Sequence, residues 1–347
     1  MDERLNEILR AVVENYIDTA EPVGSRKLTK RYNLGLSPAT IRNIMADLEY
    51  LGFLMQPHTS AGRMPTEKGY RHYVDCCIDD GHQLDERFII ETQKKLENIE
   101  RDVSSLLENV TRELSKCSHQ MGIAVAPRFS RSRLSRVELI HVKGTSVLAV
   151  VITEEGVVRN LLLDFEEPCS QQHLSKISEY INKELAGCSL EDARERVIRK
   201  VYEEKAVYDS LVARAMRIGR LIMERQVEED IYIGGYSEVL EQPNFLDLDS
   251  IKEMFRAIED KRMMIKVFNM IEEMESGVTV LIGSENPLDE MQDCSMVVSP
   301  YLKKGRVIGT IGVIGPIRMH YPQVISMVDE TAKFLTKVFS ETVGGRG

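Results

Sequence analysis

Hydrophobic residues near the N-terminus recur at intervals of three and four, which is the spacing of an amphipathic helix. This pattern predicts a first helix over residues 3–18 and a shorter second helix over 25–32. Ser37 is a favourable N-cap, and Pro38 suits the first position of a helix, because the N–H that proline lacks has no helical partner there. A third helix is therefore predicted from this proline to Tyr50.

The third predicted helix has two chemically different sides. At 100° per residue the apolar residues gather on one side, namely Ile41, Ile44, Met45, Leu48 and Leu51. The opposite side carries Ala39, Arg42, Asn43, Ala46 and Tyr50. Arginine pairs with guanine, asparagine with adenine, and a small methyl group contacts thymine, so this side suits the reading of base edges. A plain solvent-exposed side is the alternative, although it would more often carry Glu and Lys.

A strand is predicted over residues 53–56, followed by a loop rich in Thr, Ser, Gly and Pro. We interpret the loop as the wing of a winged helix-turn-helix, with an ordinary hairpin loop as the alternative. Arg63, which we expect near the tip, could enter a minor groove or meet phosphate. Thr66 can cap the next helix, where Lys68 and Arg71 would suit a phosphate. The candidate DNA-contacting residues are Ser37, Ala39, Thr40, Arg42, Asn43, Ala46, His58, Thr59, Arg63, Lys68 and Arg71.

Residues 84–119 carry apolar side chains at alternating spacings of three and four, with charges between them. This run could form a coiled coil or a long helix packed against a sheet. Leu107 widens the apolar stripe and favours the packed helix. The arginine-rich stretch 127–133 is interpreted as a solvated linker rather than a second nucleic-acid contact, because aromatic stacking partners are scarce.

The rest of the chain alternates between groups of strands and groups of helices, which indicates an α+β fold rather than a doubly wound one. Strands are predicted over 137–142, 146–153 and 157–164 as an antiparallel meander, then over 230–235, 278–283, 295–301 and 306–315. Helices are predicted over 171–186, 190–205, 207–226, 249–258, 261–274 and 322–340.

Composition limits the possible functions. The 347 residues allow two or three domains, and 43% hydrophobic with 29% charged residues is typical of a soluble globular protein. The net charge of −10 repels nucleic acid, so DNA contact requires a local positive patch. Residues 25–72 provide one, with eight basic against three acidic residues, a balance of +5.

Other functional classes find no support. No stretch reaches the roughly 20 apolar residues that span a bilayer, and the N-terminus lacks the pattern of a signal peptide, so we expect a cytoplasmic protein without membrane contact. The six dispersed cysteines contain no CxxC pair, which predicts reduced thiols and no metal site. Glycines 309, 312 and 315 fit neither nucleotide-binding spacing and are interpreted as packing positions. We expect no cofactor and no enzymatic activity.

Several motifs together resemble those of the heat-inducible transcription repressor HrcA family of bacteria. They are EPVGS (21–25), SPATIRN (37–43), PHTSAGR (57–63), IGSEN (282–286) and GTIGVIGPIRM (309–319). The likeness covers nearly the whole chain, and Met64 is the one departure, at a place where a smaller branched residue is expected.

The resemblance implies three domains. They are a winged-helix DNA-binding domain at 1–80, a discontinuous GAF-like domain at 84–130 and 226–347, and a dimerising α/β domain inserted at 131–225. It also implies a repressor of class I heat-shock (chaperone) operons that binds the CIRCE inverted repeat as a homodimer in the cytoplasm, on the nucleoid. The GroE chaperonin would maintain its activity, and heat stress would release it from DNA.

The residues by themselves support a dimer, because two helix-turn-helix units related by a two-fold axis read a palindrome. Either the 84–119 helix or the insert could form the interface, and the resemblance favours the insert. An alternative function is a winged-helix regulator controlled by a small-molecule ligand in its GAF-like domain.

Overall fold

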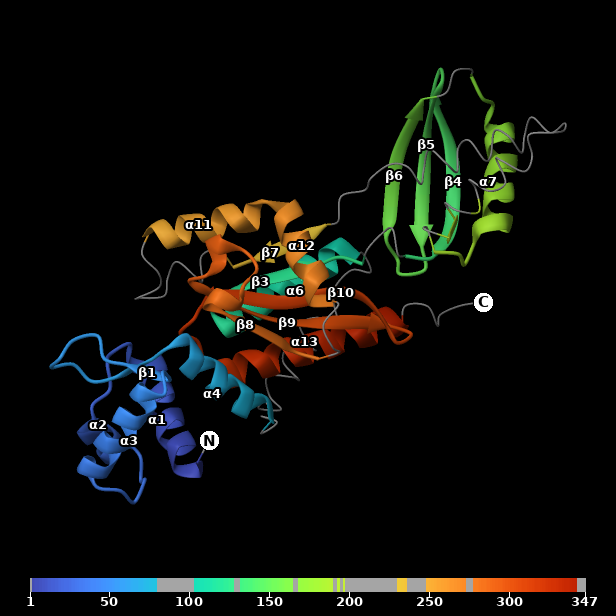
Figure 1. Cartoon of the computed structure of the whole chain (residues 1–347). Coiled ribbons are helices and arrows are strands. Elements are labelled where there is room, and N and C mark those ends of the chain that lie inside the picture. The colour runs from blue at the N-terminus through green and yellow to red at the C-terminus, as the bar shows by residue number, and fades with distance from the viewer. Residues whose placement is uncertain are drawn as a thin grey trace.

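The computed structural model is elongated, with three packing units following one another from end to end (Figure 1). The N-terminal unit comprises residues 2–79, the central unit is built on a five-stranded sheet, and the outer unit on a three-stranded sheet. The structure describes residues 2–79, 103–127, 132–164, 168–189, 192–193, 196, 230–235, 248–272 and 277–341.

The N-terminal unit contains the three predicted helices followed by a small hairpin. Its elements are α1 (Glu3–Thr19), α2 (Ser25–Arg31), α3 (Pro38–Tyr50), β1 (Leu54–Met55), β2 (Met64–Pro65) and α4 (Glu67–Asp79). The predicted cap of α3 is confirmed, because the Ser37 hydroxyl accepts a hydrogen bond from the Thr40 N–H at 3.1 Å. The strand predicted over 53–56 is shorter than expected and pairs antiparallel with β2.

The central sheet has the order β7-β3-β10-β9-β8, and every neighbouring pair is antiparallel. Its strands are β3 (Met121–Val125), β7 (Ile231–Gly234), β8 (Thr279–Ile282), β9 (Cys294–Lys303) and β10 (Arg306–Pro316). Two short 3-10 turns, η1 (Gly283–Glu285) and η2 (Asp289–Met291), join β8 to β9. The predicted α+β class is therefore confirmed.

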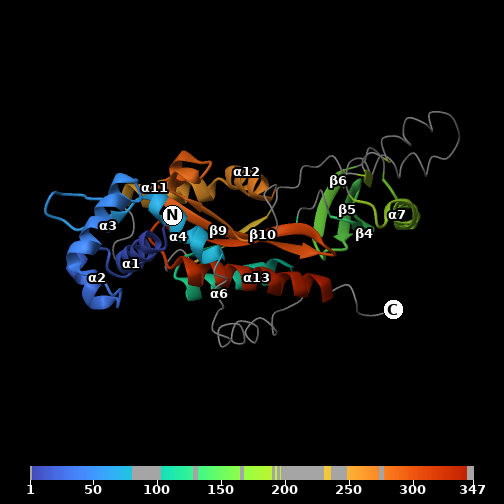
Figure 2. The ribbon, with the colours of Figure 1, turned by 60° about the horizontal axis from the view of Figure 1, so that its bottom comes forward.

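Helices cover both faces of the central sheet. Figure 2 shows α6 (Val103–Ser118) and α13 (Tyr321–Glu341) on one side, and α11 (Leu248–Glu259) and α12 (Lys261–Glu272) on the other. The sheet thus contributes to two hydrophobic cores. One core unites α6 and α13 with the N-terminal helices, and the other lies beneath α11 and α12.

Strand β3 was not predicted from the sequence. All five of its residues are buried, so the apolar and polar alternation that marks a half-exposed strand is missing. Gly122 faces α6 so closely that a Cβ atom would lie 2.2 Å from the Thr111 carbonyl oxygen. The strand is therefore defined by close helix–sheet packing, which no local pattern reveals.

Helix α6 packs against β3, β7 and α13, as expected of a helix lying on a sheet rather than of an isolated coiled coil. This outcome supports the packed-helix interpretation for residues 103–118. The earlier part of the predicted run, 84–102, lies outside the described residues.

The outer unit confirms the predicted meander. Strands β4 (Leu134–Lys143), β5 (Ser146–Thr153) and β6 (Val158–Asp164) pair in sequence order, and α7 (Gln171–Leu185) packs on one face. The chain leaves the central sheet after β3 and forms the outer unit. It returns to the central sheet as β7, which is the neighbour of β3. The helix predicted over 207–226, most of the helix predicted over 190–205 and most of the 127–133 loop lie outside the described residues.

We predict that Gly122→Ala lowers the free energy of unfolding by about 2–3 kcal/mol, because the added methyl group overlaps the backbone of α6. Urea denaturation followed by circular dichroism measures this. Gly24→Ala is the control, since a Cβ there meets nothing within 4 Å. Equal denaturation midpoints for the two variants would contradict the packing argument.

Candidate nucleic-acid interface

Helix α3 presents its polar side to solvent and its apolar side to the core. Ile41, Met45 and Leu48 are buried. The opposite side is exposed, and its members are Ala39, Thr40, Arg42, Asn43, Ala46 and Tyr50. Among the described residues, the side chains of Arg42 and Asn43 have no hydrogen-bond or ion-pair partner. These two side chains are therefore available to a ligand outside the protein.

The loop between β1 and β2 is held at its base. The backbones of Val23 and Arg63 exchange two hydrogen bonds of 2.8 and 2.9 Å, which ties the loop to the segment after α1. Gln56 donates from its side-chain amide to the carbonyl oxygens of Thr59 and Ala61, at 3.1 and 2.9 Å. The loop therefore has a defined shape.

The structure places Arg63 differently from its expected position near the loop tip. Its Nε atom lies 2.8 Å from the Glu49 carboxylate of α3, and its side chain is only 16% exposed. His58 and Thr59 are exposed. These two loop residues are therefore accessible to DNA, whereas the Arg63 side chain points toward α3.

Lys68 and Arg71 also face the protein. Lys68 donates to the Leu51 carbonyl oxygen at 2.9 Å and lies over the Phe53 ring. Arg71 donates to the Val280 carbonyl oxygen of β8 at 2.8 Å and pairs with Glu285 at 3.0 Å. The predicted cap at Thr66 is confirmed, since its hydroxyl accepts from the Gly69 N–H at 3.1 Å.

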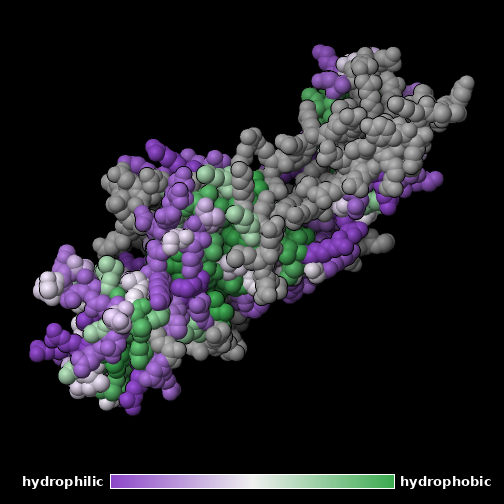
Figure 3. Space-filling view, viewed as in Figure 1, coloured by the Kyte–Doolittle hydropathy of each residue, from purple (hydrophilic) through white to green (hydrophobic). Residues whose placement is uncertain are grey.

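Two exposed cations lie on α2, which packs against α3, and they were not among the predicted DNA contacts. Arg26 and Lys30 are exposed and, among the described residues, have no ion-pair partner, whereas Lys27 pairs with Glu21. The sequence feature that could have identified them is their spacing of four residues, which places both side chains on one side of a short helix. Figure 3 shows hydrophilic side chains along the outer edge of the N-terminal unit.

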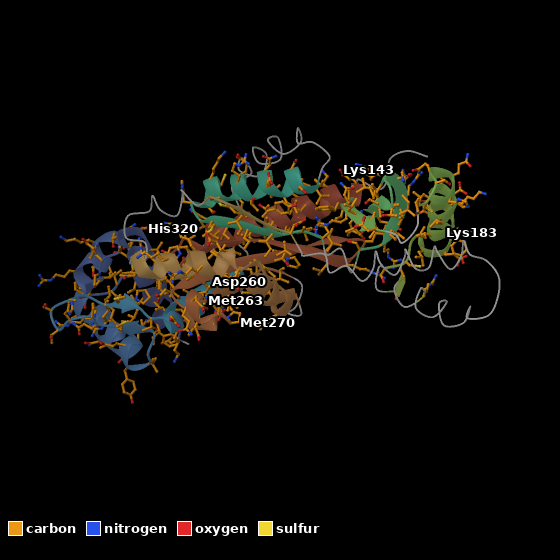
Figure 4. All side chains as sticks on the ribbon, turned by 90° about the horizontal axis from the view of Figure 1, so that it is seen from above. Lys143, Lys183, Asp260, Met263, Met270 and His320 are labelled. Carbon is orange, nitrogen blue, oxygen red and sulfur yellow. The ribbon has the colours of Figure 1, made fainter. Side chains whose placement is uncertain are left out.

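A cavity of about 390 Å³ lies where the end of α1, the turn after α6 and the start of α13 meet. Arg318, His119 and His320 are among its lining residues, and His320 is labelled in Figure 4. The Arg318 guanidinium donates to the Ile17 carbonyl oxygen at 2.6 Å and so contacts the last turn of α1. This volume lies toward the lower end of the range for small-molecule sites.

The glycines of β10 are packing positions, as the sequence analysis interpreted them. A Cβ atom on Gly312 would lie 2.3 Å from the Val297 carbonyl oxygen, and one on Gly309 2.2 Å from the Tyr301 hydroxyl. In the part of the chain that the structure describes, no group of three His, Cys, Asp or Glu side chains could hold a metal ion. No described helix has the length and apolar character needed to cross a membrane.

Comparisons with known proteins identify similar sequences over nearly the whole chain. Residues 104–325 match the family model described as the HrcA protein C terminal domain. The heat-inducible transcription repressor HrcA of Geobacter sulfurreducens is 39% identical over 97% of this chain and 98% of its own. The repressor of the same name from Syntrophobacter fumaroxidans is 37% identical over 98% of both chains.

Among solved structures, the chain is similar to the crystal structure of a hypothetical protein. The TM-score is 0.66 at 23% identity, and the match covers 99% of both chains. This likeness concerns the fold.

Proposed function

Because the chain belongs to the HrcA family of heat-inducible transcription repressors, we propose that it represses class I heat-shock (chaperone) operons by binding the CIRCE inverted repeat. The observation that carries this proposal is the exposed side of α3, where Arg42 and Asn43 have no partner among the described residues. An unpaired arginine beside an asparagine on a solvent-facing helix suits the edges of guanine and adenine.

The N-terminal unit supplies the elements of a winged helix, with α2 and α3 as the helix-turn-helix and the β1–β2 loop as the wing. We assign this domain to residues 1–80. The central unit is assigned to a GAF-like domain (84–130 and 226–347), and the outer unit to an inserted dimerising domain (131–225). The adjacency of β3 and β7 supports an insertion, because the chain leaves and re-enters the same sheet.

The other proposed DNA contacts are side chains that are exposed on the N-terminal unit. Ser37 and Thr40 at the start of α3, and His58 and Thr59 in the loop, are exposed and can meet the phosphate backbone. Ala39 and Ala46 can approach bases closely because their side chains are small. Arg26 and Lys30 add unpaired positive charge beside α3. Lys68 is exposed enough to reach phosphate if it leaves Leu51.

A dimer through the outer unit is supported by an apolar sheet face. Helix α7 covers one face, while the other presents Ile140, Leu148 and Leu162, which lie in one row across the three strands. Ile140 is 44% exposed and Leu162 49% exposed. Exposed apolar side chains aligned across a sheet are typical of a protein–protein interface, and a second copy would bury them. Such a pairing matches the symmetry of an inverted repeat.

By family resemblance, the GroE chaperonin maintains the active form in the cytoplasm, and heat stress releases the repressor from its operator. A second candidate function is control by a small molecule. The cavity at the junction of α1, α6 and α13 favours it, because a ligand there would contact both the N-terminal and the central units.

We predict that Arg42→Ala and Asn43→Ala each weaken operator binding by about 1–3 kcal/mol and relax base preference, since each removes a base contact. Gel-shift titration on the inverted repeat upstream of the chaperonin operon, at fixed salt concentration, measures this. Arg306→Ala, an exposed arginine of β10, is the control. Unchanged affinity and base preference in both variants would contradict the assignment of α3 as the helix that reads the bases.

The second prediction concerns the dimer. Replacing Ile140 and Leu162 together by Asp should weaken the dimer by about 100-fold or more, because burying carboxylates in an apolar contact is costly. Analytical ultracentrifugation over a range of concentrations measures the dissociation constant. Val307→Asp, at an exposed apolar residue of β10, is the control. A dimer of undiminished affinity in the double variant would place the interface elsewhere.

The third prediction separates the two candidate functions. After mild heating of the protein, added chaperonin with ATP should restore its footprint on the operator. The small-molecule fraction of a cell extract should not restore it. In parallel, thermal-shift measurements with that extract report ligand binding. Recovery with the small-molecule fraction alone, together with a raised melting temperature, would favour the alternative function.

A further inference from the structure

Helix α4 makes specific contacts in two directions, toward α3 and toward the central sheet. It follows the β1–β2 hairpin and is the last helix of the N-terminal unit, beside the central unit in Figures 1 and 2. Its Tyr70 packs against Tyr321 of α13 with ring centroids 6.1 Å apart, and both residues are buried. The contacts on its two sides therefore link α3 to the central sheet.

On the side of α3, α4 is fixed to the residues that end that helix. The Thr66 hydroxyl donates to the carbonyl oxygens of Gly52 and Phe53 at 2.7 and 3.1 Å. Lys68 donates to the Leu51 carbonyl oxygen. A Cβ atom on Gly69 would lie 2.2 Å from the Phe53 carbonyl oxygen, so the two backbones are in direct contact. Helices α3 and α4 therefore move as one body.

On the side of the central sheet, α4 places two charged residues on the η1 turn. The Glu67 carboxylate accepts hydrogen bonds from the N–H and hydroxyl of Ser284, at 3.2 and 2.6 Å. Gly283 allows this approach, because it has φ +54° and a Cβ there would lie 2.5 Å from that carboxyl group. Arg71 completes the contact by reaching Val280 and Glu285.

The η1 turn is itself rigidly held. The Asn286 side-chain amide donates to the carbonyl oxygens of Gly283, Met291 and Cys294, at 2.9, 3.0 and 2.9 Å. Glu285 accepts from the Ile282 N–H at 2.9 Å while it binds Arg71. This is the IGSEN segment, which no part of the proposed DNA contact uses. A turn braced in this way can hold α4 at a fixed angle.

A second polar contact joins the two units at α1. Arg318 of the central unit donates to the carbonyl oxygen of Ile17 in α1 at 2.6 Å. Two separate polar contacts, together with the shared hydrophobic core, define an orientation as well as a position.

We propose that Glu67 and Arg71, held by the η1 turn, are positioning residues that fix the angle of α3 relative to the central unit. This inference rests on the proposed function, in which two α3 helices of a dimer bind one inverted repeat. Each added base pair between the half-sites turns one of them by about 35° relative to the other. A fixed α3 angle therefore makes the dimer selective for the length of the operator spacer.

The test uses the full-length protein and Glu67→Ala, Glu285→Ala and, as a charge-matched control, Glu330→Ala of α13. Gel-shift titration compares the inverted repeat with its natural spacer, repeats with one base pair added or removed, and a single half-site. We expect the preference of the unmodified protein for its natural spacer to fall by about tenfold in the first two variants, through loss of charge-assisted hydrogen bonds. Half-site affinity should stay within about twofold, and Glu330→Ala should behave like the unmodified protein.

Two results would overturn the inference. One is full spacer preference in both Glu67→Ala and Glu285→Ala. The other is a loss of half-site affinity equal to the loss on the repeat, which would mean that these residues maintain the fold of the N-terminal unit. Failure of the unmodified protein to bind the repeat would instead contradict the proposed function.

A measurement without DNA keeps the two proposals separable. Hydrogen exchange of the 279–286 segment should be slow in the unmodified protein and faster in Glu67→Ala, because Ser284 loses its acceptor. Exchange in α13 should stay unchanged, which shows that the fold is intact. An unchanged exchange rate of residues 279–286 in Glu67→Ala would show that α4 does not contact the η1 turn in solution.

Discussion

The arrangement of this protein depends on one hydrophobic core that two units share. The apolar sides of α1, α3 and α4 pack into the same cluster as α6, α13 and one face of the central sheet. Burial of this surface holds the N-terminal unit against the sheet, but hydrophobic contact is non-directional and does not fix an angle. The polar contacts at the η1 turn and at Ile17 supply that direction.

The outer unit has a different relation to the rest. Its strands and α7 enclose a core of their own, separate from the two cores of the central sheet. The connection runs through the neighbouring strands β3 and β7, so the unit can be carried without disturbing the central sheet. At this junction Lys303 is buried beside Glu154 and Glu155, and burial lowers the pKa of its ammonium group. The outer unit lies at the opposite end of the molecule from α3 (Figure 1).

The proposed DNA interface shows how tertiary contacts sort side chains of equal charge. Arg42, Arg63 and Arg71 look alike in the sequence. Of these three, only Arg42 is exposed and has no partner among the described residues, since Glu49 binds Arg63 and the central unit binds Arg71. Arg71 has one local partner, Asp75, one helical turn away. The contacts that turn Arg63 and Arg71 toward the protein are more distant: Glu49 belongs to another helix, and Val280 lies more than half the chain away from Arg71. Local spacing carries no information about such pairs.

The sequence by itself determined the local elements: the capped α3 with its polar side, the meander of the outer unit, the α+β class and the motifs that mark the family. Helical and strand periodicity, caps and turn residues act within a few positions, and so they can be read directly. Only the tertiary structure decided that 121–125 is a strand, that Glu67 and Arg71 meet the IGSEN turn, and that a cavity lies beside Arg318. These features arise from backbones brought together by burial, which no local pattern encodes.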